Sequence, residues 1–275
     1  RSWRKPIYEN NRRTDIQYLA VVEEVVYVFT TYKNPEADAY ELNLETFNQG
    51  GKQLSEHALL HQQDVKRGEY DVRFEKSLNK KKLLVYIDRN TRADNELIDY
   101  FVFGATGQPD SKGTLSIPYS DDQFEIQQIS ISNDGELYAM GRNTLRGRIR
   151  DPRDVSFHMF YKTTRNDSLY EYKFSSNKRY ITDLKLKIDR NGHAIVGGFF
   201  SNKAPSQVGG TIYGNIDVDT RFPIRSAELT FREIDNEFLK RYIRPRQLER
   251  GEELRDFYLD KLILRSDGGM LMLAE

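Results

Sequence analysis

The sequence predicts an all-β protein: a β-propeller of four-stranded antiparallel blades with one short α-helical insertion. Three observations lead to this fold class: a hairpin pattern that occurs three times, a repeat of nearly constant length, and 32 Tyr and Phe residues in a chain of 275. Aromatic residues favour strands. The three hairpins cover residues 127–141, 182–197 and 259–274. Each has a strand of alternating polarity, a turn with glycine and a second apolar strand, which is the pattern of a hairpin.

The repeat length supports blades. The first hairpin turn of each unit falls near Glu24, Lys80, Gly135, Gly192 and Gly268, at successive intervals of 56, 55, 57 and 76 residues. About four strands fit in each of the first three intervals, and propeller blades of the kelch type are about 50 residues long. Blades are therefore expected near 15–65, 66–122, 123–178 and 179–230, with a further hairpin at 256–275.

The last interval is longer and has a pattern of its own. Phe231, Ile234, Phe238 and Tyr242 follow one another at spacings of three, four and four, which predicts one face of an amphipathic helix. Pro245 is expected to end it. The sequence thus predicts a helix near 232–243 within an insertion at 231–250.

The two ends of the chain differ from the repeats. Residues 1–14 are basic and polar, and an irregular lead-in is expected there. The chain ends inside a predicted strand, residues 270–274, so it is expected to be part of a longer polypeptide and of a larger propeller.

Composition excludes several classes of function. Lys and Arg number 42, as do Asp and Glu, so no excess positive charge favours a nucleic acid as partner. There is no cysteine, which excludes disulfides, thiolate metal sites and a thiol nucleophile. No apolar stretch approaches the roughly 20 residues of a membrane helix. No membrane-spanning segment and no cofactor are predicted.

The turns and the residues that follow them point to a type of repeat. Each hairpin turn offers an Asn or Asp and a Gly that tolerate a positive φ, and the second strand ends in a small residue, Gly141, Gly197 or Ala274. This pattern resembles the bacterial β-propeller repeats of the NHL and SBBP type. The resemblance implies a rigid binding platform, with a protein or a cell-surface glycan as partner, in the periplasm or at the cell surface.

Two histidines have a spacing seen in zinc sites. His57 and His61 are four residues apart, which would place both on one face of a helix. The segment is not clearly helical and no third ligand is evident, so surface histidines are favoured and no metal is predicted. His158 and His193 fall in predicted strands, where packed or surface side chains are expected rather than catalytic bases.

Two segments are candidates for binding. The first is a basic loop with Arg142, Arg146, Arg148, Arg150 and Arg153, which could bind phosphate, an acidic glycan or an acidic partner. Its alternative is a solvated loop partly neutralised by Asp151 and Asp154. The second is the insertion, through Phe238, Leu239 and Tyr242, unless its apolar stripe docks on the propeller instead.

The sequence favours a non-catalytic interaction or scaffold module. No residue is assigned a catalytic role, and neither a G-x-S-x-G elbow nor a P-loop is present. The alternative is a polysaccharide-acting hydrolase or lyase, in which carboxylates would converge at a propeller face. The carboxylates suspected for that role are Asp94, Glu96, Asp217 and Asp219, although exposed acidic residues are commonly solvated. A two-domain chain with a break near Pro223 is a third possibility.

Overall fold

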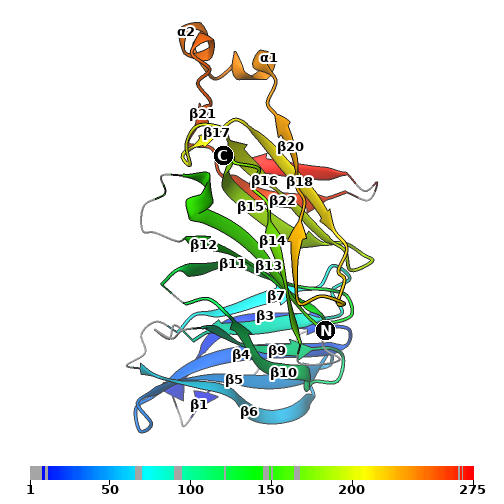
Figure 1. Ribbon diagram of the computed structural model, residues 1–275. Helices are drawn as coiled ribbons and strands as arrows, with labels where there is room; N and C mark the ends of the chain where they lie inside the picture. The colour runs from blue at the N-terminus through cyan, green and yellow to red at the C-terminus, as the bar shows by residue number, and fades with distance from the viewer. Residues whose placement is uncertain are drawn as a thin grey trace. The chain divides into compact units, whose positions relative to one another are not determined.

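The computed structural model describes most of the chain: residues 8–9, 12–65, 70–89, 95–120, 122–144, 149, 151–163, 168–265, 267 and 269–275. The chain divides into two compact units, residues 1–121 and 122–275. Both units consist mainly of antiparallel strands, with few helical residues (Figure 1). The predicted all-β class is confirmed.

Unit 1 contains two four-stranded sheets in which neighbours in sequence are neighbours in the sheet. The first is formed by β3 (Asp15–Val22), β4 (Val25–Asn34), β5 (Ala39–Asn48) and β6 (Gln53–Asp64). The second is formed by β7 (Val72–Lys76), β8 (Leu83–Asp88), β9 (Glu96–Phe103) and β10 (Pro109–Ile117). The lead-in was expected to be irregular, but it contains β1 (Tyr8–Glu9) paired with β2 (Arg12–Arg13).

Unit 2 contains two large sheets and two short strand pairs. The first sheet is formed by β11 (Phe124–Ile131), β12 (Leu137–Thr144), β13 (Val155–Lys162), β14 (Leu169–Phe174) and β19 (Ile224–Ala227). The second is formed by β15 (Tyr180–Ile188), β16 (Ala194–Ser201), β18 (Gly210–Ile216) and β20 (Thr230–Glu233). The pairs are β17 (Gln207–Val208) with β21 (Leu254–Arg255), and β22 (Leu259–Leu264) with β23 (Met270–Ala274). A 3₁₀ turn, Pro152–Asp154, precedes β13.

Adjacent sheets within each unit are joined by buried side chains as well as by apolar packing. In unit 1 the hydroxyl of Tyr27, on β4, donates to Gly104 O at 2.6 Å and accepts from Gly107 N at 3.0 Å. Burial raises the pKa of Tyr27 to about 12. In unit 2 the hydroxyl of Tyr138, on β12, donates to Gly192 O at 2.7 Å. In both units, therefore, a tyrosine on the second strand of the first large sheet binds the next sheet.

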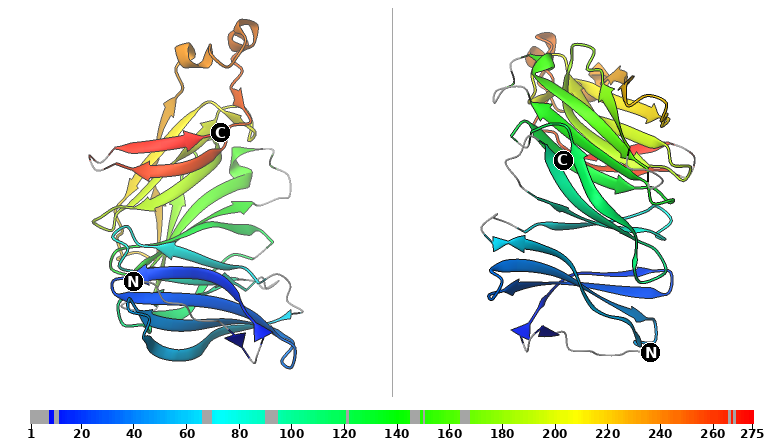
Figure 2. Two further views of the ribbon diagram at one scale, coloured as in Figure 1. Left: turned by 180° about the vertical axis from the view of Figure 1, so that it is seen from behind. Right: turned by 60° about the horizontal axis from the view of Figure 1, so that its bottom comes forward.

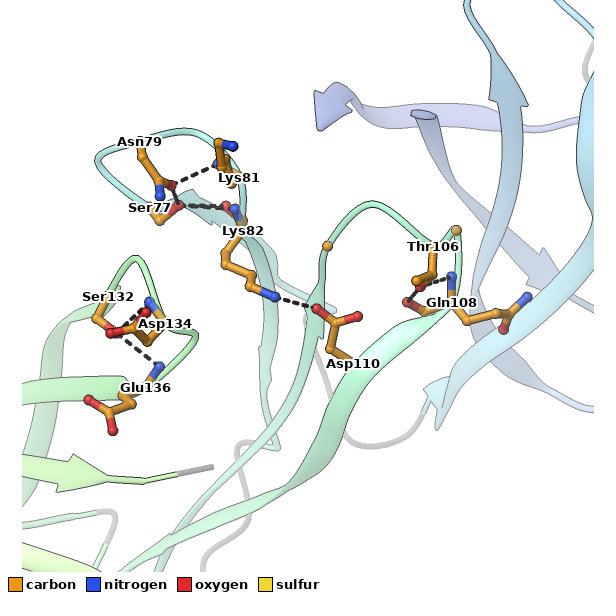
Figure 3. A network of polar contacts seen from close by, with 12 residues as sticks. Ser77, Asn79, Lys81, Lys82, Thr106, Gln108, Asp110, Ser132, Asp134 and Glu136 are labelled. Atoms are coloured by element: carbon orange, nitrogen blue, oxygen red, sulfur yellow. Dashed lines mark hydrogen bonds and ion pairs between the residues drawn. The ribbon is translucent and has the colours of Figure 1, made fainter. Parts of the chain in front are cut away.

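Two features recur in the hairpins. The first strands β3, β11, β15 and β22 each have a register shift near their start, and such a bulge bends and twists a strand. The turns are held by a side chain at their first position: Ser132 Oγ accepts from Glu136 N at 3.1 Å and Asp189 Oδ1 accepts from His193 N at 2.8 Å. Figure 3 shows the Ser132 turn, and also the turn in which Ser77 Oγ accepts from Lys82 N.

The structure explains the residues predicted at the turns and strand ends. Gly135 and Gly192 have φ of +91° and +87°, and the corresponding residue of the first hairpin is Glu23, at +53°, rather than Glu24. A Cβ at Gly141 would lie 2.4 Å from the ring of Phe124, and one at Gly197 would lie 2.7 Å from Leu262. Close packing therefore requires the small residues. Gly268 lies outside the residues that the structure describes.

The region after β18 differs from the prediction. Residues 224–230 were expected to complete the fourth blade, but β19 crosses to the neighbouring sheet and pairs parallel with β14. The fourth strand of the β15–β16–β18 sheet is β20, which includes the predicted helix start. The helix is replaced by α1 (Asn236–Leu239) and α2 (Pro245–Glu249), which lie beyond the sheets of unit 2 (Figure 1).

The terminal hairpin β22–β23 packs beside β15 and β16, as both views of Figure 2 show. Leu259 N donates to Asp183 Oδ2 at 2.9 Å and Lys185 Nζ donates to Asp260 O at 2.8 Å. Among the residues that the structure describes, no helix is long and apolar enough to cross a membrane.

Candidate functional site

A cavity of about 640 Å³ opens in unit 2 where the chain passes from β18 to β19. Its lining includes a tyrosine, three carboxylates and two arginines: Tyr172, Asp217, Asp219, Arg221, Arg225 and Glu228. Five of these six residues come from the short segment 217–228, so the site depends on how that segment is held.

The segment is anchored on β14. The buried hydroxyl of Tyr172 accepts from Asp219 N at 2.7 Å and donates to Asp219 O at 3.1 Å. Glu171 N, in addition, donates to Pro223 O at 2.7 Å, at the start of the parallel pairing with β19. Both polar groups of the Asp219 backbone are therefore satisfied by one side chain, which fixes the middle of the loop.

Asp219 is held by two arginines. Arg221 binds it in a fork, with Nε 2.9 Å from Oδ1 and Nη2 2.7 Å from Oδ2. Arg225 Nη1 donates to Oδ2 at 2.6 Å. These hydrogen bonds, those of Arg221 foremost, hold the pKa of Asp219 well below its usual range. Asp219 is therefore an ionised carboxylate that organises the cavity, and a poor proton donor.

Asp217 stands apart from this cluster. Its side chain is 83% exposed, and Oδ1 lies 3.7 Å from His193 Nε2. The other ring nitrogen of His193 lies 3.1 Å from Asp189 Oδ2. Burial opposes ionisation of Asp189, but the backbone N–H groups of His193 and Asn191 outweigh it and lower its pKa. The ionised Asp189 thus orients the imidazole toward Asp217.

Glu228 supplies the third carboxylate. It lies between two buried apolar residues, Ala227 and Leu229, and is itself exposed. Leu229 packs closely over Gly214, where a Cβ would lie 2.8 Å from it. Glu228 is among the residues that line the cavity. Asp217 and Glu228 are therefore two exposed carboxylates on one cavity, and such a pair can serve acid and base chemistry.

Unit 1 holds a second polar cluster, whose members are hydrogen-bonded to one another. His61 Nδ1 lies 2.9 Å from Tyr70 Oη and Nε2 lies 3.1 Å from Asp99 Oδ2. Arg89 donates to both oxygens of Asp99, at 2.6 and 2.7 Å, and Thr114 Oγ1 donates at 2.6 Å. Burial alone would raise the pKa of Asp99, but the bonds from His61, Arg89 and Thr114 hold it well below its usual range. Burial raises the pKa of Tyr70.

The structure separates the four suspected carboxylates. Asp217 and Asp219 share the cavity in unit 2. Glu96 is buried at the start of β9 in unit 1, and Asp94 lies outside the residues described. The sequence reasoning missed Tyr172, Arg225 and Glu228. A signal was present for Arg221, which follows Asp219 by two residues, but only the crossing of β19 brings Glu228 to the same cavity.

The basic loop is described only at its two ends. Arg142 Nη2 donates to Glu125 Oε2 at 2.8 Å, on β12 and β11. Arg153 forms a fork with Asp151, at 2.8 and 3.0 Å, and is 84% exposed. The remaining three members, Arg146, Arg148 and Arg150, lie outside the described residues. A binding role for this loop stays a prediction.

The insertion residues have different surroundings. Leu239 is buried in a cluster with Phe199, Val208 and Leu254, so it docks the insertion on unit 2. Phe238 and Tyr242 are exposed, with their rings 5.1 Å apart. A partner for this pair stays a prediction.

The two histidines with zinc spacing lie on a strand rather than a helix. His57 and His61 are both on β6, and the ladder between β5 and β6 shifts register between them. His57 Nδ1 lies 3.7 Å from Glu45, whereas His61 belongs to the Asp99 cluster. Within the described part of the chain, no three His, Cys, Asp or Glu residues form a group that could hold a metal ion.

No known family profile and no curated protein matches the sequence. Solved structures with partial similarity include a chimera of the apocarotenoid oxygenase ACO and RPE65, with a TM-score of 0.47, 7% identity, and coverage of 95% of this chain and 56% of that one. A second is the Pyrococcus horikoshii acylaminoacyl peptidase, with a TM-score of 0.42 and 11% identity. The match covers 79% of this chain and 32% of the peptidase. A third is a GH43 β-xylosidase/α-arabinofuranosidase from a compost microbial metagenome, with a TM-score of 0.32 and 11% identity. The match covers 79% of this chain and 77% of the glycosidase.

These three proteins are enzymes: an oxygenase chimera, a peptidase and a glycosidase. The prediction of a non-catalytic interaction or scaffold module is therefore corrected, and the enzyme alternative is taken up below as a proposal. With TM-scores below 0.5, the similarities transfer no activity, substrate or metal to this chain. The chain spans about half the length of the oxygenase chimera. Support for an enzyme must come from the cavity.

Proposed function

We propose that this chain is a polysaccharide-acting hydrolase and that the cavity of unit 2 is its active site. We propose further that the four large sheets are blades of a β-propeller. The resemblance of this chain to NHL and SBBP repeats stays a prediction. One observation supports the activity: Asp217 and Glu228, two exposed carboxylates, line a cavity with the ionised Asp219 and two arginines.

Glycoside hydrolysis needs two carboxyl groups with opposite tasks. One protonates the oxygen of the glycosidic bond, and the other activates water or attacks the sugar carbon directly. Asp219 is unsuited to the first task because Arg221 and Arg225 keep it ionised. Asp217 and Glu228 are therefore assigned the acid and base roles as a pair.

The rest of the lining suits a sugar. Asn215, Thr220 and Ser226 contribute amide and hydroxyl groups to the cavity, and these can donate to and accept from sugar hydroxyls. Arg225 Nη1 binds Asp219, which gives this side chain a fixed direction. Because both arginines of the lining are bound by Asp219, a neutral or weakly charged polysaccharide rather than a strongly acidic one is the expected substrate.

The test is release of reducing sugar from a panel of polysaccharides by the wild type and by Asp217→Asn and Glu228→Gln. Each substitution is expected to lower kcat by about 10²- to 10⁴-fold, the usual effect of losing an acid or base. Glu249→Gln, an exposed residue of α2, is the matched control and should keep full activity. Added azide should restore the rate for the variant that lost the base or nucleophile.

Two outcomes would contradict the proposal. The first is unchanged activity in both Asp217→Asn and Glu228→Gln, which would place the chemistry elsewhere. The second is a wild type that releases no sugar from any polymer of the panel while its fold is intact. An unsaturated product that absorbs ultraviolet light would replace the hydrolase by the lyase alternative.

A further inference from the structure

His158, on β13, lies between a hydroxyl and a carboxylate. Its Nε2 is 2.6 Å from Ser156 Oγ, and its Nδ1 is 2.6 Å from Glu171 Oε1. Hydroxyl, imidazole and carboxylate in this order form the arrangement of a nucleophile, a general base and an orienting group. The sequence analysis expected only a packed or surface histidine at this position.

The strands fix the three side chains. Ser156 and His158 are two residues apart on β13 and therefore share a face of the sheet. Glu171, on β14, is directly opposite Phe160 in the ladder. Phe160 is two residues after His158 on β13, so Glu171 is on the same face as His158 and diagonally opposite it. Because all three positions belong to regular strands, the geometry does not depend on a loop.

The carboxylate determines the state of the imidazole. In the tautomer with the proton on Nδ1, Glu171 accepts from His158, and Nε2 carries the lone pair that accepts the proton of Ser156. Lys173 Nζ lies 3.8 Å from Glu171 Oε1. The His158 and Glu171 side chains are 3% and 6% exposed, whereas Ser156 is partly exposed. The reactive end of the chain of bonds is thus the accessible end.

A neighbouring side chain has an open hydrogen bond. Asn143 is directly opposite Ser156 in the β12–β13 ladder and so lies on the same face. Its side chain is buried, and among the residues described its Oδ1 has no hydrogen-bond partner. A buried polar atom without a partner is costly, and Oδ1, as an acceptor, could be satisfied by the O–H of the water that hydrolyses the acyl-serine.

We propose that Ser156, His158 and Glu171 form a second catalytic site, which hydrolyses small acyl esters. Ser156 Oγ bonds to the acyl carbon as its proton passes to His158 Nε2. The ester C–O bond then breaks, and the alcohol leaves with that proton. Water attacks the acyl-serine, giving a proton to His158, and the acid is released as Ser156 regains its proton. Glu171 is a positioning residue.

This activity is separate from the proposed polysaccharide site. Ser156, His158 and Glu171 are not among the residues that line the cavity with Asp217 and Glu228. Loss of either activity should therefore leave the other intact.

The test is labelling with a fluorophosphonate, followed by peptide mass spectrometry, together with hydrolysis of p-nitrophenyl acetate. The wild type should be labelled at Ser156 and should hydrolyse the ester. Ser156→Ala should lose both, and Ser206→Ala, an exposed serine of the same unit, should lose neither. His158→Gln should lower the labelling rate by about 10²-fold or more.

Glu171→Gln tests positioning. It should lower the rate and displace the pH profile of labelling, because the imidazole loses its ionised partner. An unlabelled Ser156 in the folded wild type would overturn the proposal. So would labelling at Ser156 that is as fast in a folded His158→Gln variant as in the wild type.

Discussion

The two units contain polar clusters built from the same side chains and used in opposite ways. In unit 1, Asp99 receives bonds from His61, Arg89 and Thr114, and its side chain is only 9% exposed. In unit 2, Asp219 is bound by Arg221 and Arg225, but Asp217 and Glu228 beside it remain exposed on a cavity.

The difference shows how hydrogen-bond saturation separates structure from function. Asp99 receives its hydrogen bonds from protein groups, and the cluster connects β6 to β9, β10 and Arg89, the residue that follows β8. A substrate would have to displace one of these bonds. In the cavity of unit 2 one carboxylate, Asp219, is bound by two arginines, whereas Asp217 and Glu228 stay exposed, so the ion pairs support a site that can still accept a ligand.

The largest effect on stability is expected from Asp99→Asn. The amide cannot accept the forked bond of Arg89 and also the bonds of His61 and Thr114, so buried donors lose their partner. The free energy of unfolding of unit 1 should fall by about 2–3 kcal/mol. Hydrogen exchange at β6 and β9 during urea titration measures it. Protection equal to the wild type would show that the cluster does not stabilise the sheets.

Disruption of the cavity loop should reduce activity more than stability. Asp219→Asn removes the partner of Arg221 and Arg225, which would let the segment of Asp217 and Glu228 move. A small misplacement of reacting groups is costly, so kcat/KM should fall by about 10- to 100-fold. Steady-state kinetics on the best polysaccharide measures this. An unchanged kcat/KM would show that the ion pairs do not position the carboxylates.

Acid should destabilise unit 1 through Asp99. Its folded-state pKa lies below the unfolded value of about 3.9, so its contribution is complete above that value and is lost as the pH falls through the folded-state pKa. Urea midpoints between pH 3 and pH 7 should decline at the acid end. In Asp99→Asn the decline should be smaller, and an equal decline in both would assign it to other groups.

The smallest effect is expected from Tyr172→Phe. The ring remains packed, but the Asp219 backbone loses the hydroxyl that satisfies both its N–H and its carbonyl. Stability should fall by about 1 kcal/mol, with a modest rise in KM. Thermal unfolding and steady-state kinetics together measure the change. A loss as large as that of Asp99→Asn would indicate that the loop is part of the core.

Much of the fold was predictable because strands and turns leave local signals. The alternation in residues 127–131 and 182–188 gave β11 and β15, and the glycines at 135 and 192 have the positive φ that their turns require. The crossing of β19 left no such signal, since Ile224–Ala227 reads as a strand whichever sheet it joins. The predicted helix failed because Phe231 belongs to β20, where its ring packs edge-on against Phe200.

The candidate site was predictable only where its residues are close in sequence. Asp217 and Asp219 were suspected from their alternation. Glu228 reaches their cavity through the crossing to β14 and back, which is a long-range pairing. His61 and Asp99 are 38 residues apart and meet only when two sheets pack.

We propose that the Asp99 cluster stabilises the fold and that the cavity of unit 2 performs the chemistry. The most direct test is reducing-sugar release per folded molecule, measured for Asp99→Asn and Glu228→Gln with the folded fraction determined in the same samples. Asp99→Asn should be less stable but as active per folded molecule as the wild type, and Glu228→Gln should be as stable but about 10²- to 10⁴-fold less active. The reverse pattern, with activity lost in Asp99→Asn and retained in Glu228→Gln, would contradict the account.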